Sequence, residues 1–217
     1  MTQLLSKDLK LAASPLSYGF LAFSLMTLLP GYPILVGPMF VCLGIFYSFQ
    51  NAREVNDSLY SVLLPVDRAE VVRAKYRFVT LLQLIAFGIM LLLTVLRMTV
   101  LWNVPVYLNN VMMPANPVFL AWTLLIYAAF HRLFVDGFYR TAYGLARPFL
   151  GFIFVAILMM GVGELLFHIA GLEFLGDRRP SSLLIQCGIL AVAALIYGLT
   201  VRSSCRRSAA RFDELDF

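Results

Sequence analysis

Long apolar runs separated by short polar connections dominate this chain of 217 residues. A helix needs ~20 residues at 1.5 Å each to cross a hydrocarbon core about 30 Å thick, and the runs have about this length. They are too continuous for the alternation of a membrane β-barrel, and lipid does not tolerate unpaired backbone groups. The pattern predicts an all-α polytopic membrane protein with six transmembrane helices, near Ser14–Leu29, Tyr32–Phe49, Phe78–Leu101, Pro117–Val135, Pro148–Ala170 and Ser181–Val201.

Two of the connections have a local structure of their own. Residues 30–33, Pro-Gly-Tyr-Pro, predict a tight turn, so the first two spans form a hairpin. The fourth run is short at Pro117–Phe130, and its helix needs Arg132 to extend its side chain to the inner interface. The Asp-Gly pair at 136–137 then predicts a break, followed by a shorter interfacial helix over Phe138–Arg147.

The longest polar connection, residues 51–76, predicts two helices joined by an elbow. Asp57 is a good N-cap for a short amphipathic helix, and Pro65 ends that helix because its ring pushes the preceding residue out of the helical region. Asp67 caps a second helix that continues into the third span, with Glu70 at capping-box spacing. We therefore expect a short helix lying across the membrane surface, joined by a proline elbow to a membrane-entering helix.

Composition supports this fold class. Hydrophobic residues make up 61% of the chain and charged residues 13%, with a mean hydropathy of +0.84. Soluble domains are about 45–50% apolar and about 25% charged, so an ordinary soluble domain is excluded. The first run lacks a small-x-small cleavage site followed by a polar mature region, and we expect it to be retained as a span. Cys42, Cys187 and Cys205 have neither metal-site spacing nor a disulfide framework.

The basic residues predict an orientation. Of the 17 Lys and Arg, all but Arg97, Arg178 and Arg179 fall on the side that also holds both termini. Basic residues in short loops select the cytoplasmic side, so we expect both termini inside, with a cytoplasmic tail at 202–217. The net charge of +5 suits anionic lipid headgroups, and it gives no reason to invoke nucleic acid.

A pattern of residue pairs marks the connection between the second and third spans: Asn56-Asp57, Tyr60-Ser61, Leu64-Pro65, Asp67-Arg68, Val71-Val72 and Lys75-Tyr76. It resembles the cytoplasmic loop of the integral-membrane permease subunits of type-2 ABC (ATP-binding-cassette) exporters, in the small bacterial branch without a fused ATPase. The segment Phe130–Phe149 is similar to the second cytoplasmic loop of that family, and the six-span layout covers nearly the whole chain.

The resemblance implies a coupling helix, which in such exporters sits in a cleft of the ATPase subunit. The docking face it implies consists of Glu54, Asp57, Leu59, Tyr60 and Leu63, with Pro65 as the elbow. Residues at the cytoplasmic membrane surface and elbow would be Asp67, Arg68, Glu70, Lys75 and Arg77, of which Lys75 and Arg77 can bind phosphates. It also implies two ATPase chains and two permease chains, as a homodimer or a dimer with a sister permease, in the bacterial plasma (inner) membrane.

Motifs for chemistry within the chain are missing from the sequence. Its lysines, Lys7, Lys10 and Lys75, do not follow a glycine-rich loop, so ATP and Mg²⁺ would be bound by the partner ATPase. There is no Gly-x-Ser-x-Gly, no His-Glu-x-x-His and no pair of membrane-buried aspartates, which argues against an intramembrane protease or a lipid-modifying enzyme. We expect no cofactor, no metal and no catalytic residue in this chain.

Glu164 and His168 are ionisable residues at i and i+4 within a predicted span. Glu164 would lie roughly 24 Å along the helix from Pro148, near the outer boundary. Three interpretations remain open: a structural pair at the outer interface, an outer gate or substrate contact, and metal or hydrolytic chemistry, of which a metal site needs more than two ligands. Arg97 is expected to extend its side chain outward, with a role in gating or substrate contact as the alternative.

We therefore expect a permease subunit of an ATP-driven exporter. The family implies amphipathic peptides, antibiotics or lipid-like compounds as cargo. The alternative is a membrane scaffold or sensor subunit that binds a cytosolic partner without transport. An ion-coupled carrier would show several buried acids or broken helices at mid-membrane, and the sequence shows little of either.

Overall fold

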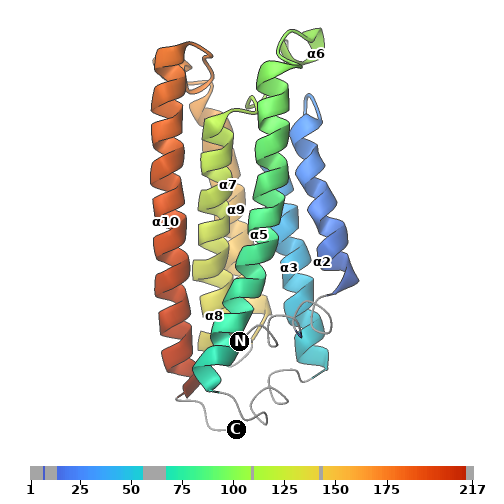
Figure 1. Ribbon diagram of the computed structural model, residues 1–217, viewed down its shortest axis with the longest axis vertical. Coiled ribbons are helices and arrows are strands. Elements are labelled where there is room, and N and C mark those ends of the chain that lie inside the picture. Colours follow the sequence, from blue (N-terminus) through green and yellow to red (C-terminus); the bar gives the residue numbers. More distant parts are fainter. Residues whose placement is uncertain (1–6, 8–13, 56–66, 109, 142–143, 214–217) are drawn as a thin grey trace.

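The computed structural model describes residues 7, 14–55, 67–108, 110–141 and 144–213, and the described elements are all helical. Their rods lie along one common long axis (Figure 1). In chain order they are α2 (Pro15–Gly19), the 3₁₀ helix η2 (Phe20–Leu28), α3 (Val36–Glu54), α5 (Arg68–Thr99), α6 (Pro105–Leu108), α7 (Pro117–Ala129), the π-helix η3 (Phe130–Val135), α8 (Asp136–Arg140), α9 (Ala146–Leu166), the 3₁₀ turn η4 (Glu173–Leu175) and α10 (Pro180–Asp213).

The first two apolar runs form a helical hairpin whose turn lies at the Pro-Gly-Tyr-Pro sequence. Gly31 in this turn has φ +67°, a left-handed conformation that glycine adopts without a steric penalty. α3 approaches the preceding segment so closely at Gly44 that an added Cβ would collide with Phe20. The same approach lets Ser17 Oγ donate a hydrogen bond to the Gly44 carbonyl at 2.5 Å and lie 2.6 Å from Ser48 Oγ.

The fourth rod is continuous where a break was predicted. α7, η3 and α8 together form one helical stretch from Pro117 to Arg140. The chain passes Asp136 by π-winding, in which the Asp136 N–H donates to the carbonyl of His131, five residues earlier. The predicted separate helix over Phe138–Arg147 was wrong, because α8 ends at Arg140 and α9 begins at Ala146.

α10 is longer than predicted. The expected span ended at Val201, but the helix continues to Asp213, so residues 202–213 of the expected tail extend the sixth rod. A stripe at helical spacing explains the continuation, since Ser204, Ser208 and Phe212 are all buried against the bundle. α9 ends at Leu166, before the predicted end at Ala170.

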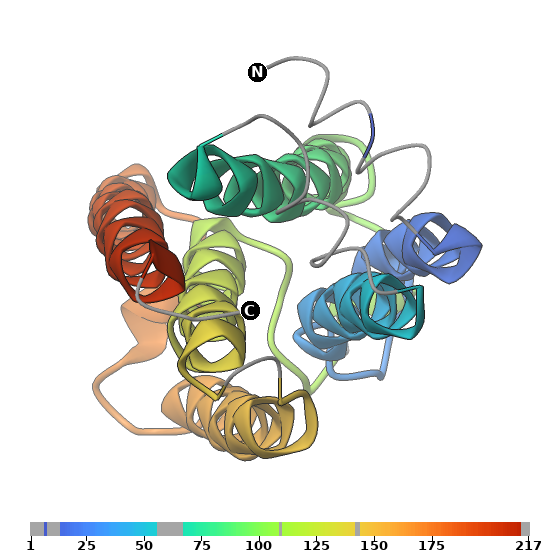
Figure 2. The same ribbon diagram turned by 90° about the horizontal axis from the view of Figure 1, so that it is seen from below.

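Four helices are long and apolar enough to cross a membrane: α5, the rod Pro117–Arg140, α9 and α10. The rod Pro117–Arg140 is 72% buried in its most apolar stretch, against 17–33% for the other three, and it lies in the middle of the bundle (Figure 2). α2 and η2 form a shorter apolar helix over Pro15–Leu28, and α3 ends in polar residues, including Gln50 and Arg53. The described chain is thus a multi-pass membrane protein with four clear spans.

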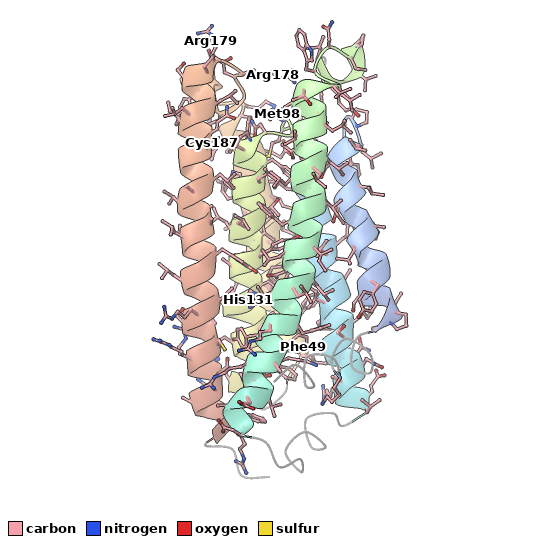
Figure 3. The ribbon with its side chains drawn as sticks, in the orientation of Figure 1. Phe49, Met98, His131, Arg178, Arg179 and Cys187 are labelled. Atoms are coloured by element: carbon pink, nitrogen blue, oxygen red, sulfur yellow. The ribbon has the colours of Figure 1, made fainter. Side chains whose placement is uncertain are left out.

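The two ends of the bundle differ in charge. The end of α3, the beginning of α5, the end of α8 and the end of α10 lie together (Figure 1). We call this the basic end, since its described basic residues include Arg53, Arg68, Arg73, Lys75, Arg77, Arg132, Arg140, Arg147, Arg202, Arg206, Arg207 and Arg211. The opposite end carries Arg178 and Arg179 (Figure 3) and also Arg97, which lies in the last turn of α5.

Candidate functional site at the basic end

A buried carboxylate connects the fourth rod to α10. Asp136 at the start of α8 has a side chain only 4% exposed and accepts a hydrogen bond from Arg132, one turn earlier. Two arginines of α10 reach the same carboxylate: Arg211 Nη1 lies 2.7 Å from Oδ1, and Arg207 Nε lies 3.5 Å from Oδ2. Ser208 Oγ also donates to Oδ1 at 3.2 Å. We call this group the Asp136 cluster; it joins segments more than 70 residues apart in the chain.

Helix geometry explains why these groups meet. Arg207 and Arg211 are spaced i and i+4, so they lie on one face of α10. Because a π-turn contains more residues per turn than an α-turn, η3 changes the angular position of the residues that follow it. Asp136 comes directly after η3 and faces α10 rather than solvent. A carboxylate removed from water in this way needs charged and hydrogen-bonding partners, and the cluster supplies them.

The cluster continues into α5 through hydroxyl groups. Tyr76 Oη lies 2.9 Å from Ser208 Oγ, within hydrogen-bond distance. The Tyr76 ring stacks on His131, with ring centroids 5.5 Å apart. Tyr76 therefore links α5 to α10 and, by stacking, to the central rod.

Deeper in the bundle, Tyr197 Oη of α10 donates to Gln83 Oε1 of α5 at 3.0 Å. Gln83 Nε2 in turn lies 4.0 Å from Cys42 Sγ of α3. His131 is completely buried between Tyr76 and Tyr197, and neither of its ring nitrogens has a hydrogen-bond partner within the described part of the chain. Polar contacts thus extend from the basic end toward the middle of the membrane-spanning helices.

The residues predicted to dock an ATPase lie at or beside this end. Glu54 ends α3, and its carboxylate accepts a hydrogen bond from Gln50 Nε2 at 3.2 Å. The other predicted docking residues and the proline elbow lie outside the described residues: Asp57, Leu59, Tyr60, Leu63 and Pro65. The connection that contains them begins and ends at the basic end, because α3 finishes there and α5 starts there (Figure 1).

The start of α5 agrees with the prediction in part. Asp67 is the N-cap, and its Oδ1 accepts from the Ala69 N–H at 3.2 Å. Arg68 and Glu70 follow in the first turn, where the acid suits the positive end of the helix dipole. The cap consists of this one bond; a reciprocal bond from Glu70 to the Asp67 N–H, which a capping box requires, is not found between these two described residues.

Lys75, which was expected near the membrane surface, has its side chain inside the bundle. It is buried, and its Nζ lies 5.5 Å from the Phe49 ring centroid and 5.6 Å from that of Phe78. The ammonium group is thus held against aromatic faces of α3 and α5. Arg77, two residues later, is exposed on the outside of α5, where a phosphate group can reach it.

At the opposite end, Glu164 and His168 do not bond through their side chains to each other. Glu164 Oε2 accepts from the Met113 N–H at 2.9 Å, while His168 Nδ1 lies 2.9 Å from the Glu164 carbonyl oxygen. His168 comes after the end of α9, so the two residues do not lie on one regular helix face as predicted.

Arg97 is buried rather than extended outward. Its Nη1 donates to the Thr27 carbonyl at 2.7 Å, and its guanidinium lies 4.3 Å from the Tyr107 ring centroid. It therefore attaches the end of α5 to the first hairpin and to the loop around α6. Within the described chain, no group of three or more His, Cys, Asp or Glu side chains lies close enough to hold a metal ion.

Sequence reasoning missed the Asp136 cluster. Asp136 was interpreted only as a helix break, and Arg207 and Arg211 only as charges of a cytoplasmic tail. The available signal was the periodicity of residues 204, 208 and 212, small or apolar positions among arginines, which indicates a helix with one buried face.

Comparison with known proteins identifies a family for this chain. A search of curated proteins and a search of solved structures each gave no significant match. The family model described as ABC-2 family transporter protein matches residues 3–207, nearly the whole chain. This confirms the predicted family, and the chain belongs to the ABC-2 transporter family as a membrane transport subunit.

Proposed function

We propose that this chain is the permease of an ATP-driven exporter with six spans and both ends cytoplasmic, in a bacterial plasma membrane. The family supports the transport role, and the charge difference between the ends supports the orientation, since basic residues stay on the cytoplasmic side. For the first span, nine 3₁₀ residues rise about 2.0 Å each, so Pro15–Leu28 extends over roughly 25 Å despite its few residues. α3 completes the hairpin as the second span.

The observation that carries the coupling proposal is the position of the two helix ends that the docking connection joins. α3 ends and α5 begins at the basic end, which in the proposed orientation faces the cytoplasm. A soluble ATPase can reach only this side. Residues 51–65 then form the coupling helix, with Glu54, Asp57, Leu59, Tyr60 and Leu63 as the docking face and Pro65 as the elbow.

The Asp136 cluster would transmit the ATPase movement. The helix that follows the docking connection, α5, is bonded through Tyr76 to Ser208 of α10, and α10 is bonded through Arg211 to Asp136 of the central rod. A displacement of α5 therefore acts on three rods together rather than on one. ATP binding shifts the permease between its states only if the ATPase binds those states with different affinity.

The motor lies in another chain. The sequence has no P-loop lysine, so ATP and Mg²⁺ bind to the partner ATPase, in two copies for a transporter with two permease chains. The second permease is an identical chain or a sister subunit. At the outer end, Glu164 and Arg97 hold the extracellular connections against the helices, so they are candidates for a closed outer gate. Amphipathic peptides, antibiotics or lipid-like compounds are the proposed cargo.

The test is a reconstitution with the ATPase encoded nearest to this chain. The pair is placed in lipid vesicles, and ATP hydrolysis and movement of a fluorescent amphipathic peptide are measured. We expect Tyr60→Ala combined with Leu63→Ala to abolish peptide movement and to reduce copurification of the ATPase, because the two substitutions remove large side chains from the docking face.

The matched control is Leu195→Ala combined with Leu199→Ala, which shortens two exposed side chains of α10. This variant should copurify with the ATPase and transport like the unaltered chain. Full transport by the Tyr60 and Leu63 variant would overturn the docking assignment. ATPase binding without any transport by the unaltered pair would instead favour the scaffold function.

A further inference from the structure

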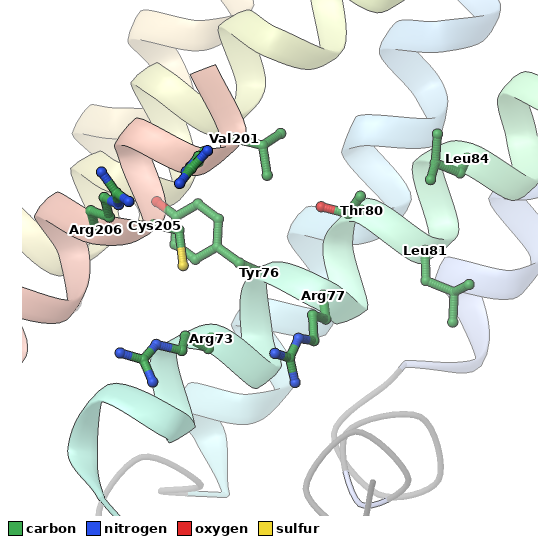
Figure 4. Close-up of a pocket in the computed structure, with 10 residues that line it drawn as sticks. Arg73, Tyr76, Arg77, Thr80, Leu81, Leu84, Val201, Cys205 and Arg206 are labelled. Carbon is green, nitrogen blue, oxygen red and sulfur yellow. The ribbon is translucent and has the colours of Figure 1, made fainter. Parts of the chain in front are cut away.

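A groove of about 560 Å³ lies between α5 and α10 near the basic end (Figure 4). Its walls combine two kinds of side chain. The apolar lining comes mainly from Leu81, Leu84 and Val201, with the Tyr76 ring at the back. The remaining lining includes four arginines, Arg73 and Arg77 of α5 and Arg202 and Arg206 of α10.

The arginines form two pairs, one on each side of the groove. Each pair is spaced i and i+4, so both members lie on the same helix face. All four side chains are exposed, and none has an ion-pair partner among the described residues. Their neighbours Arg207 and Arg211 behave differently, because these turn inward to Asp136. The groove therefore concentrates positive charge that the described protein does not neutralise.

The depth of the groove matches a lipid interface. On α5 the uncharged stretch between Arg77 and Arg97 rises roughly 30 Å, and along α10 the stretch between Arg179 and Arg202 rises roughly 35 Å. Both values are close to a hydrocarbon core of about 30 Å. Arg77 and Arg202 thus lie at one boundary of the core, whereas Leu81 and Leu84 lie one to two turns deeper.

We propose that this groove binds one anionic diacyl phospholipid. Its phosphate lies among the four guanidinium groups, which donate charge-assisted hydrogen bonds to phosphate oxygens. One acyl chain follows the apolar lining toward the membrane centre. A soluble phosphate would use only the arginines and leave this lining exposed, so the combination of charge and depth selects a lipid.

The lipid would stabilise the contact between α5 and α10. Tyr76 forms the back of the groove with its ring, while its hydroxyl reaches Ser208 and so the Asp136 cluster. A bound phosphate bridges the same two helices from the membrane side. This inference depends on the groove and its charges, and it holds whether or not the chain works with an ATPase.

The test uses the full chain in nanodiscs of neutral phosphatidylcholine with increasing phosphatidylglycerol, and native mass spectrometry counts the lipids retained per chain. We expect one retained phosphatidylglycerol. Arg77→Gln combined with Arg202→Gln should weaken retention about 30-fold, from the loss of two phosphate contacts. The matched control is Arg140→Gln with Arg147→Gln, which removes the same charge from exposed positions at the same end and should change retention by less than about threefold.

Cys205 gives an independent readout because it lines the groove, whereas Cys187 is exposed near the other end of the same helix (Figure 3). In detergent, added phosphatidylglycerol should slow maleimide labelling of Cys205 and leave that of Cys187 unchanged. Equal retention by the two arginine variants, equal retention of neutral lipid, or protection of Cys205 by soluble glycerol phosphate at the same concentration would each overturn the proposal.

Discussion

The two ends of the bundle hold their helices together by different kinds of bond. In the Asp136 cluster at the basic end, side chains bond to side chains: Asp136 bonds to Arg132 of its own rod and to Arg211 of α10, and Tyr76 bonds to Ser208. At the opposite end, side chains bond to the backbone. Arg97 donates to the Thr27 carbonyl, and Gln186 Nε2 donates to the carbonyls of Phe174 and Asp177.

Three further bonds between separate segments at the opposite end have the same character, whereas Asp177 bonds locally to the side chains of Arg179 and Ser182. Asn116 Nδ2 donates to the Leu175 carbonyl at 2.6 Å, Tyr107 Oη donates to the Leu28 carbonyl at 2.9 Å, and Glu164 accepts from the Met113 N–H. Side chain–backbone bonds fix the path of a loop. Side chain–side chain bonds leave the backbone of each helix free to shift and re-pair. We therefore expect the opposite end to be the more rigid and the basic end to accommodate movement.

The largest effect should come from Asp136→Asn. The change leaves three guanidinium groups around a neutral amide, and breaking a buried ion pair costs about 3–5 kcal/mol. The arginine side chains are 35–53% exposed, so water solvates the guanidinium groups in part and the loss falls at the low end of this range. We expect the free energy of unfolding to fall by about 3 kcal/mol, which lowers Tm by roughly 6–12 °C. Thermal unfolding in detergent measures it.

Asp177→Asn is the matched control, since this acid lies in a loop at the opposite end and is only partly covered. Its Tm should change by less than about 2 °C, as for a surface substitution. Equal Tm values for the two variants would show that the basic end has no special role in stability.

In a double-mutant cycle, the losses in unfolding free energy from Asp136→Asn and Arg211→Gln should be clearly non-additive, because both substitutions interrupt the same bond.

A smaller effect is expected for Arg97→Met. The variant keeps most of the side-chain length but removes the donor to the Thr27 carbonyl and the cation above the Tyr107 ring, for a loss of about 2 kcal/mol. Thermal unfolding measures this loss as well. Arg178→Met, which removes an exposed side chain of the same end with one long bond to the Trp102 carbonyl, at 3.3 Å, should change stability by less than about 0.5 kcal/mol. If Arg97→Met instead raises Tm, the cost of burying the guanidinium group outweighs the bonds that it makes. The expectation that the opposite end is the more rigid one then loses its main support.

The smallest global effect should come from Gln186→Met, at about 1 kcal/mol, because two neutral hydrogen bonds to a loop are replaced by an apolar side chain. Its local effect should be distinct. Amide hydrogen exchange in residues 173–178 should accelerate, while exchange in α8 stays unchanged. Gln50→Met, which removes a bond between two side chains at the basic end, should leave exchange in residues 173–178 unaltered. Faster exchange spread evenly over both ends would contradict the comparison.

The sequence determined that the chain is a helical membrane protein and where its clear spans lie. Run length and backbone hydrogen bonding are local properties, so α5, α9 and the rod beginning at Pro117 are apparent from residue order alone. The uneven distribution of basic residues and the residue pattern of the 51–76 connection, which indicated the family, can likewise be read from residue order alone. The same reasoning also places Gly31 in a turn, because only local conformation is needed there.

Tertiary structure alone decided the positions of Asp136, Lys75 and Arg97. In an apolar sequence, an isolated charge predicts a surface or a loop, because burying it without partners is unfavourable. Each of these charges is buried instead: Asp136 and Arg97 by bonds to residues 70 or more positions away, and Lys75 over the ring of Phe49 in another helix. A partner so distant in sequence becomes visible only when helix packing brings it into contact. For the same reason, the continuation of α10 past Val201 depends on the surface against which Ser204, Ser208 and Phe212 pack.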